Sequence, residues 1–222
     1  MSGQGDLFTP RAEERMSFVL RLRARGIADV AVLRALELVP RHLFVPHVYA
    51  DLAWRDIALP IACGQTMSEP YQLARVMEAL QARPDQRVLE VGAGSGYATA
   101  ILARLGTQVV SFERYRTLAT EASVRLRELG LENVRVIHGD GLAPDADIGV
   151  FDRIILDGAV ADVPPEVMAL LARDGIVIFA REDAEGRCHM IRRADEKSAG
   201  LRDAILFPCR AMALARGKST TF

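Results

Sequence analysis

Cysteine is scarce in this sequence, and its spacing does not suit a crosslinked fold. The 222 residues include three cysteines, Cys63, Cys188 and Cys209, with no C-x-x-C pair. An odd number at wide spacing argues against a disulfide framework and against a cysteine-based zinc site. The four histidines also lack a metal-ligand spacing. We therefore expect no bound metal and a reducing compartment.

Long apolar runs and a strong net charge are absent as well. No run approaches the roughly 20 residues that cross a bilayer, and the first residues lack the basic and apolar regions of a secretory signal. The net charge is −1 at pH 7, so the chain as a whole is not attracted to nucleic acid or to anionic membranes. We expect a cytoplasmic protein with no membrane or nucleic-acid partner. Without a heptad repeat or an obvious apolar patch, we expect a monomer.

The composition is that of a globular domain, with 50% hydrophobic and 26% charged residues. At this length we expect one full-sized domain. In its first part, apolar residues recur at helical spacing in three stretches: Ala12–Arg25, Asp29–Leu38 and Tyr71–Gln81. Ser68 is a candidate N-cap of the third helix. The less regular residues 41–67 are interpreted as a connector that runs over the surface.

From residue 85 onward, short apolar runs alternate with helical segments, which is typical of a parallel α/β sheet. Five strands are predicted, at Arg87–Val91, Gln108–Glu113, Val134–His138, Arg153–Asp157 and Ile176–Ala180. Three helices are predicted between them, at Tyr97–Leu105, Arg116–Leu129 and Pro164–Ala172. The strands are apolar on both faces, as in a doubly wound, mostly parallel sheet covered on both sides. Because no helix separates Cys188–Arg192 from Ala204–Pro208, we expect a terminal antiparallel pair.

A glycine-rich loop, Gly92–Gly96, joins the first of these strands to the first helix between them. Such a turn lets a ligand lie against the backbone at a helix N-terminus, although purely structural glycines would look similar. Its G-x-G-x-G spacing differs from the G-x-G-x-x-G pattern of dinucleotide sites. Glu90 precedes the loop, and a carboxylate there repels a pyrophosphate but suits the cationic methionine end of S-adenosylmethionine. The loop therefore predicts a site for that cofactor.

Acidic residues lie at the ends of two further predicted strands. Glu113 follows Gly96 by 17 positions, and its carboxylate can accept both ribose hydroxyls. Asp140 follows the third strand, where it can meet the adenine amino group. Each acid alone is more often a turn residue or a cap. Since ligands of open α/β sheets bind at the carboxyl ends of the strands, three acids at successive ends support the cofactor prediction.

Three stretches of the chain carry a family resemblance: Val39–Pro46, Leu59–Ile61 with Gly64–Tyr71, and Val88–Leu105 with Ser111–Arg114. They resemble the protein-L-isoaspartate (D-aspartate) O-methyltransferases. Gly64–Tyr71 is the informative stretch, because G-Q-T-[IM]-S-x-P ahead of the cofactor loop is close to a family signature. The loop itself is shared by many methyltransferases.

The resemblance implies a Rossmann-like, class I methyltransferase that depends on S-adenosylmethionine and releases S-adenosylhomocysteine. Residues 1–84 would form a helical, substrate-lining region packed on a cofactor-binding core, residues 85–222. The implied substrates are damaged proteins with L-isoaspartyl or D-aspartyl residues, whose α-carboxylate is methylated for repair. Thr66 and Ser68 would line the active site, with the Ser68 hydroxyl touching that carboxylate. The residues assigned to the cofactor are Glu90, Gly92, Ala93, Gly94, Ser95, Gly96, Glu113, Arg114, Asp140, Gly141 and Asp157.

The chemistry of such a site needs no strong base. A carboxylate with a pKa near 4 is already ionised at pH 7, and the methyl group is bound to a sulfonium leaving group. The protein mainly has to align oxygen, carbon and sulfur and to exclude water, which can supply roughly 7–11 kcal/mol. Ser68 would donate a hydrogen bond that fixes the carboxylate, and it could cap the following helix at the same time.

The sequence departs from the family pattern on the substrate side and in the C-terminal half. Glu69 follows Ser68 where the family has a small or neutral residue, and a second carboxylate there is unfavourable unless it points away or pairs with an arginine. Asp157 ends the fourth strand where the family tends to be neutral, and Leu142 replaces an aromatic residue. The cofactor half is intact, so methyl transfer is indicated more firmly than isoaspartate repair.

Four other interpretations stay open. A diverged methyltransferase could act on another small molecule or peptide, for which Glu69 and Asp157 would suit a cationic or hydroxyl-bearing group. A binding module could keep the cofactor pocket without turnover, with Ser68 serving only as a cap. A nicotinamide-dependent oxidoreductase is disfavoured by the glycine spacing. A nucleic-acid methyltransferase is disfavoured by the neutral charge and by Asp157–Ala159, where an Asn/Asp-Pro-Pro-Tyr/Phe segment is expected.

Overall fold

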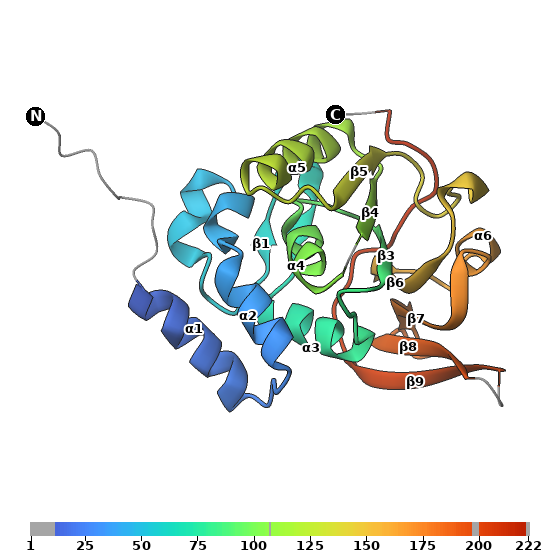
Figure 1. The fold of residues 1–222 in the computed structure, drawn as a ribbon, viewed down its shortest axis with the longest axis horizontal. Helices are drawn as coiled ribbons and strands as arrows, with labels where there is room; N and C mark the ends of the chain where they lie inside the picture. The colour runs from blue at the N-terminus through green and yellow to red at the C-terminus, as the bar shows by residue number, and fades with distance from the viewer. Residues whose placement is uncertain (1–11, 107, 197–199, 221–222) are drawn as a thin grey trace, which may run out of the picture.

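A seven-stranded sheet organises the C-terminal part of the chain (Figure 1). The computed structural model describes residues 12–106, 108–196 and 200–220. The strands are β3 (Arg87–Val91), β4 (Gln108–Glu113), β5 (Val134–His138), β6 (Phe151–Ala159), β7 (Leu171–Glu182), β8 (Cys188–Glu196) and β9 (Gly200–Pro208). Their order is β5-β4-β3-β6-β7-β8-β9. Strands β3 to β7 pair in parallel, whereas β8 and β9 pair antiparallel, so the predicted sheet and its terminal pair are confirmed.

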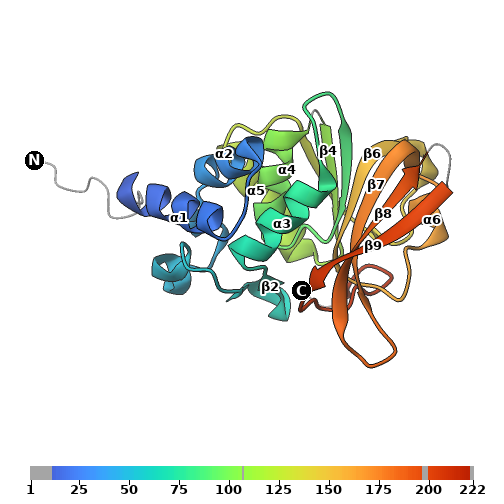
Figure 2. The same ribbon diagram turned by 90° about the horizontal axis from the view of Figure 1, so that it is seen from below.

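The helices cover the two faces of the sheet unequally. They are α1 (Ala12–Ala24), α2 (Val30–Leu38), α3 (Pro70–Leu80), α4 (Tyr97–Leu105), α5 (Arg116–Glu128) and α6 (Pro165–Met168). The larger apolar core lies between α1 to α5 and one face of the sheet, and the smaller core lies on the opposite face, where α6 packs. Figure 2 shows α2, α3 and α4 together on one side and α6 beyond the strands.

Short elements join α2 to α3. They are the 3-10 helices η1 (Arg41–Phe44), η2 (His47–Leu52) and η3 (Ala62–Gly64), and the strands β1 (Leu59–Pro60) and β2 (Thr66–Met67). A further 3-10 helix, η4 (Ala146–Ile148), precedes β6. Strands β1 and β2 form an antiparallel hairpin with Leu59 opposite Met67.

The strand order reverses between β3 and β6, and this reversal determines where a ligand can lie. The chain passes from β3 through β4 to β5 on one side, and then returns to place β6 on the other side of β3. At such a switch point the loops after the two neighbouring strands diverge and leave a crevice at their carboxyl ends. The glycine loop follows β3, and Asp157 lies near the end of β6.

The side chains of β3 alternate between the two cores, as the pleat of a strand requires. Val88 belongs to the larger core, whereas Leu89 and Val91 belong to the smaller core. Glu90 therefore shares the face of Val88 and points toward the helices. This alternation decides the surroundings of the Glu90 carboxylate.

The helix predicted over Pro164–Ala172 is wrong beyond its first turn. Helix α6 ends at Met168, and Leu171 already pairs with Phe151 as the first residue of β7. Its apolar residues Val167 and Leu170 are both buried, so the apolar pattern was real. Pairing with β6 overrides the local helical preference after one turn.

Ser68 as the N-cap of α3 is also wrong. The helix begins at Pro70, and Glu69 occupies the N-cap position without a side-chain cap hydrogen bond. The Ser68 carbonyl instead accepts a hydrogen bond from Arg41 at 3.0 Å. Residue 68 thus belongs to the extended segment that follows β2.

Residues 41–67 are not a simple surface connector. Arg41, Phe44, Ala53 and Leu59 are 0%, 1%, 0% and 2% exposed. The segment therefore contributes to the larger core, which also joins the N-terminal helices to the sheet. Among the described residues, no helix combines the length and the apolar character needed to cross a membrane.

Candidate active site

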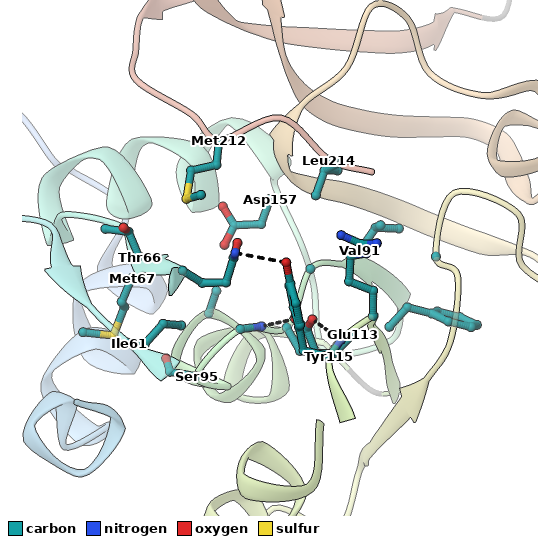
Figure 3. Close-up of a pocket in the computed structure, with 18 of the residues that line it drawn as sticks. Ile61, Thr66, Met67, Val91, Ser95, Glu113, Tyr115, Asp157, Met212 and Leu214 are labelled. Carbon is teal, nitrogen blue, oxygen red and sulfur yellow. Dashed lines mark hydrogen bonds between the residues drawn. The ribbon is translucent and has the colours of Figure 1, made fainter. Parts of the chain in front are cut away.

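A cavity of about 250 Å³ lies at the carboxyl ends of the central strands (Figure 3). Most of its lining comes from four parts of the chain: the glycine loop with Val91–Ser95, the ends of β4 and β5 with Phe112–Tyr115 and Gly139, Gly141 and Leu142, the hairpin segment with Ile61 and Gln65–Ser68, and the C-terminal residues Met212–Ala215. Leu73 of α3, Tyr97 and Ala98 of α4 and Asp157 of β6 complete it. The cavity thus joins the glycine loop to the segment that carries the family signature.

Most of the residues assigned to the site from the sequence line this cavity. They are Thr66, Ser68, Gly92, Ala93, Gly94, Ser95, Glu113, Arg114, Gly141 and Asp157. Glu90, Gly96 and Asp140 are not among its lining residues. These three residues lie outside the lining and contact the residues that form it, each in a different way.

Gly96 shapes the loop from behind. It has a φ of +88° and stands at the N-cap of α4, a conformation that residues with a Cβ rarely adopt. A Cβ at this position would also lie 3.0 Å from the Cβ of Ala122 in α5. Glycine is therefore required here for the close approach of α4 to α5, not for a contact with a ligand.

Glu113 fastens the glycine loop to the end of β4. Its carboxylate accepts hydrogen bonds from the backbone N–H of Gly94 and of Tyr115, both at 2.8 Å. The backbone N–H groups of Gly92 and Ala93 donate to the Phe112 carbonyl at 2.8 and 3.0 Å. Glu113 thus holds the loop and faces the cavity at once, and its bond to the ribose hydroxyls stays a prediction.

Asp140 holds the C-terminal segment. One carboxylate oxygen accepts from Leu142 N at 2.9 Å and the other from Gly217 N at 2.7 Å. Both oxygens of its carboxylate thus have a backbone donor, and a contact with the adenine amino group stays a prediction. The neighbouring Gly141 does line the cavity, and a Cβ there would lie 2.7 Å from the nearest Val91 side-chain carbon.

Glu90 is completely buried between α4 and β4. It accepts hydrogen bonds from the hydroxyls of Thr99, at 2.5 Å, and of Ser111, while its other oxygen, Oε1, has no partner. Burial raises the pKa of Glu90 to about 8 against the lowering effect of these hydrogen bonds. The arrangement gives Glu90 no direct contact with the methionine end of a cofactor, contrary to the electrostatic argument from the sequence.

Asp157, unlike Glu90, is a carboxylate that lines the cavity. It lies near the end of β6, beside Gly92, and its side chain points into the cavity (Figure 3). No hydrogen-bond donor or cation of the described residues pairs with its carboxylate. Burial within the cavity walls, and secondarily the charge of Glu113, raises the pKa of Asp157 to about 6. The Asp157 side chain is exposed, but to the solvent that fills the cavity and not to the outer surface of the protein.

The substrate side is formed by the hairpin segment. Thr66 is exposed and Ser68 is half-buried, and no described residue takes a hydrogen bond from the Ser68 hydroxyl. Glu69 does not line the cavity, and its charge acts instead on buried Arg41, whose pKa it raises against the larger effect of desolvation. The unfavourable second carboxylate therefore points away from the site.

Several lining residues were not anticipated from the sequence. Gln65 Nε2 lies 3.5 Å from the Tyr115 hydroxyl, so a hydrogen bond links the hairpin segment to the end of β4. Met212 and Leu214 close the cavity near the end of β6, since Ala159 pairs through its N–H and carbonyl with Met212 O and Leu214 N. No motif marks this C-terminal segment. Arg41 belongs to a stretch that carries the resemblance, but nothing in the sequence indicated its burial.

Among residues 12–106, 108–196 and 200–220, no group of three or more histidine, cysteine, aspartate or glutamate residues is arranged to hold a metal ion.

Known proteins match almost the whole chain. The family model described as protein-L-isoaspartate (D-aspartate) O-methyltransferase matches residues 13–208. The chain belongs to this family. A protein-L-isoaspartate O-methyltransferase 2 of Rhodopseudomonas palustris strain HaA2 is 48% identical over 193 residues, which cover 87% of this chain and 89% of the relative. A protein-L-isoaspartate O-methyltransferase of strain BisA53 is 53% identical over 165 residues, or 74% and 77% of the two chains.

Solved structures of isoaspartate O-methyltransferases share the fold. One with that name superposes with a TM-score of 0.79 at 26% identity, over 90% of this chain and 66% of the other. A Plasmodium falciparum protein described as a β-aspartate methyltransferase in complex with S-adenosyl-L-homocysteine gives 0.76 at 23% identity, over 90% and 98%. The family resemblance carried by Gly64–Tyr71 and the glycine loop is thus confirmed.

Proposed function

We propose that this chain transfers the methyl group of S-adenosylmethionine to the free carboxylate of damaged aspartyl residues in proteins, which is the α-carboxylate of an L-isoaspartyl residue and the side-chain carboxylate of a D-aspartyl residue. The observation that carries the proposal is a single cavity with the glycine loop on one wall and Thr66 and Ser68 on another. Both substrates of a direct transfer have to meet in one enclosed space. The family to which the chain belongs supports the same reaction.

The residues of the cavity fit the cofactor. Val91, Phe112 and Leu142 offer apolar walls near the ends of β3 to β5, which suits a flat adenine ring. At the other side, Asp157 offers a carboxylate without a partner, which suits the positively charged methionine end. When bound, the cofactor supplies an electrophilic methyl group on a sulfonium, and its product is S-adenosylhomocysteine.

The chain itself positions the acceptor and excludes water. The acceptor carboxylate needs no base, because it is ionised at neutral pH. The Ser68 hydroxyl is available to donate a hydrogen bond to one carboxylate oxygen, which leaves the other oxygen to attack. The hairpin segment and the C-terminal segment line the cavity on two sides, and a substrate bound between them would displace water from the reacting atoms.

The proposal includes where the protein works and with what. Cys63, Cys188 and Cys209 are free thiols, which supports a cytoplasmic location. Isoaspartyl-containing proteins or peptides are the proposed partners, with a monomeric enzyme and no nucleic-acid or membrane partner.

Two peptides that differ only in Asp or isoAsp at one position test this function. With labelled S-adenosylmethionine, label is expected in the isoAsp peptide alone. Ser68→Ala is expected to lower kcat/KM for that peptide about tenfold, since one hydrogen bond to a charged group is lost. The affinity for S-adenosylhomocysteine, measured by calorimetry, should stay unchanged.

Val48→Ala serves as the matched control, because Val48 is 78% exposed and does not line the cavity. If the cofactor binds but neither peptide is labelled, isoaspartate methylation is contradicted. A diverged methyltransferase with another acceptor is then favoured, and Asp157 in the cavity would suit a cationic or hydroxyl-bearing group of that acceptor. Full activity of Ser68→Ala would leave that hydroxyl without a role in the reaction.

A further inference from the structure

Arg41 is a completely buried arginine whose hydrogen bonds all go to backbone carbonyls. It lies in η1 and is 0% exposed. Nη1 donates to the carbonyls of Ala53 at 2.5 Å and Arg55 at 3.4 Å. Nη2 donates to Ile57 at 3.1 Å and Ser68 at 3.0 Å. Arginine stays protonated in proteins, so a buried cation lies behind the candidate catalytic serine.

The bonds of Nη2 bracket the hairpin segment, residues 57–68. Ile57 lies just before β1 and Ser68 just after β2, so one nitrogen joins the two ends of the segment. Between these ends the ladder has two residue pairs, and the turn adds backbone hydrogen bonds from Ile61 N to Gln65 O at 2.9 Å and from Gln65 N to Ala62 O at 3.2 Å. A hairpin of this length does not hold its shape by itself. It still supplies five residues of the cavity lining, Ile61 and Gln65–Ser68.

The charge of Arg41 favours an anion near Ser68. Desolvation lowers the pKa of Arg41, while electrostatic interaction with Tyr97 and with the carboxylates of Asp56 and Glu69 raises it. Among the described residues, no carboxylate forms an ion pair with the guanidinium, which lies 5.7 Å from the ring centroid of Tyr97, a residue that lines the cavity. Its positive potential therefore extends toward the place where an isoaspartyl carboxylate would lie.

We propose that Arg41 is a positioning residue for methyl transfer, which clamps the ends of segment 57–68 and thereby places Ser68 against the acceptor carboxylate. This inference rests on the proposed function. A planar guanidinium can hold carbonyls on both nitrogens at once, whereas a lysine ammonium is a single point donor on a flexible stem. Lysine at position 41 keeps the charge and loses the clamp.

Arg41→Lys tests the clamp, with Arg153→Lys as its matched control. Arg153 is also buried, at 7% exposed, and donates to the carbonyls of Gln81 and Asp152 away from the cavity. Arg41→Lys is expected to lower kcat for the isoAsp peptide at least tenfold. S-adenosylhomocysteine affinity should change less than twofold, and Arg153→Lys should keep the wild-type kcat.

A double-mutant cycle separates positioning from general support of the fold. If Arg41 acts through Ser68, the kcat loss of Arg41→Lys shrinks to about twofold or less in a Ser68→Ala background. An undiminished loss in that background would overturn the proposal, as would wild-type kcat in Arg41→Lys. Arg41→Gln is the second variant if the lysine variant does not bind S-adenosylhomocysteine. If neither variant folds, Arg41 is a structural residue and the proposal fails.

Amide hydrogen exchange tests the clamp without any activity. In Arg41→Lys, exchange should accelerate at least tenfold for amides of residues 58–68 and remain unchanged in β3 and β4. This result would stand even if the wild-type enzyme did not methylate the isoAsp peptide, in which case the proposed function fails and the clamp survives. Unchanged exchange in segment 57–68 would overturn the clamp while leaving the proposed function untouched.

Discussion

Asp157→Asn is expected to weaken the binding of S-adenosylmethionine and S-adenosylhomocysteine roughly 10- to 150-fold, which corresponds to about 1.5–3 kcal/mol for a hydrogen bond to a charged group. The Asp157 carboxylate faces the cavity at the crevice between β3 and β6, without a partner among the described residues. The α-ammonium group is the cation that both ligands share, and we expect the carboxylate to pair with it. Methylthioadenosine lacks this group, so its affinity should stay within twofold of wild type. Titration calorimetry with the three ligands measures the difference.

The pH dependence of cofactor binding follows from the same carboxylate. Burial, and then the charge of Glu113, raises the pKa of Asp157 to about 6. Only the ionised form attracts an ammonium group, so the affinity should be highest above pH 6 and fall as the pH drops through that value. Asp157→Asn should remove this part of the pH dependence. The groups that face Asp157 across the cavity are Glu113 and, from the same segment, Arg114.

Asp162→Asn is the control for these measurements, because Asp162 is an exposed acid that pairs with Arg193 and does not line the cavity. It should bind all three ligands as the wild type does. An equal loss for methylthioadenosine in Asp157→Asn would place the carboxylate at the adenosine end. It would contradict a pairing with the methionine end.

The central strands β3 and β4 could be predicted closely because the sheet buries them on both faces, and the half-buried edge strand β5 still carries an apolar run. Strands β3, β4 and β5 begin and end where the apolar runs indicated. Helix α2 was predictable in a similar way, since Asp29 caps it through Ala31 N at 2.8 Å and Val32 N at 3.1 Å. These signals are local in sequence, and the structure has the elements where the local pattern predicts them.

The failures share one cause, which is that a contact distant in sequence decided the outcome. Leu171 leaves the predicted helix because Phe151 pairs with it. Ser68 is not a cap because its carbonyl is bound by Arg41, 27 positions earlier. The C-terminal residues around Met212 are held at the cavity by hydrogen bonds to Ala159, more than 50 positions earlier. None of these partners is visible in a local window of sequence.

The direction of the acidic side chains at the strand ends was the other limit. The sequence places Glu90 and Asp157 near neighbouring strand ends, but it does not say which face each side chain takes. The pleat turns Glu90 toward Thr99 and Ser111, and leaves Asp157 in the cavity. The sequence therefore indicated a negative group beside the cofactor, and of these two carboxylates only that of Asp157 lines the cavity.

Glu90→Gln is expected to change how stability depends on pH. The pKa of Glu90 is about 8 in the folded protein against 4.5 for a free glutamate. Below pH 4.5 the group is protonated in both states. Between these values unfolding releases its proton. Glu90 therefore lowers the free energy of unfolding by up to about 1.4 kcal/mol for each unit that the pH rises. Glutamine does not titrate, and its carbonyl can accept from the same two hydroxyls.

Urea unfolding between pH 5 and 8.5 measures this effect. The free energy of unfolding of Glu90→Gln, relative to that of the wild type, should rise by several kcal/mol from pH 5 to pH 8.5. The variant should bind S-adenosylhomocysteine as the wild type does, because Glu90 does not line the cavity. Glu128→Gln, at an exposed position of α5, is the control and should keep the wild-type slope. Parallel curves for Glu90→Gln and wild type would show that Glu90 ionises in the folded protein near its ordinary pKa. If Glu90→Gln instead lost affinity for S-adenosylhomocysteine while its stability depended on pH as in the wild type, Glu90 would have to contact the ligand. A carboxylate that affects binding but not the pH dependence of stability must reach the cavity.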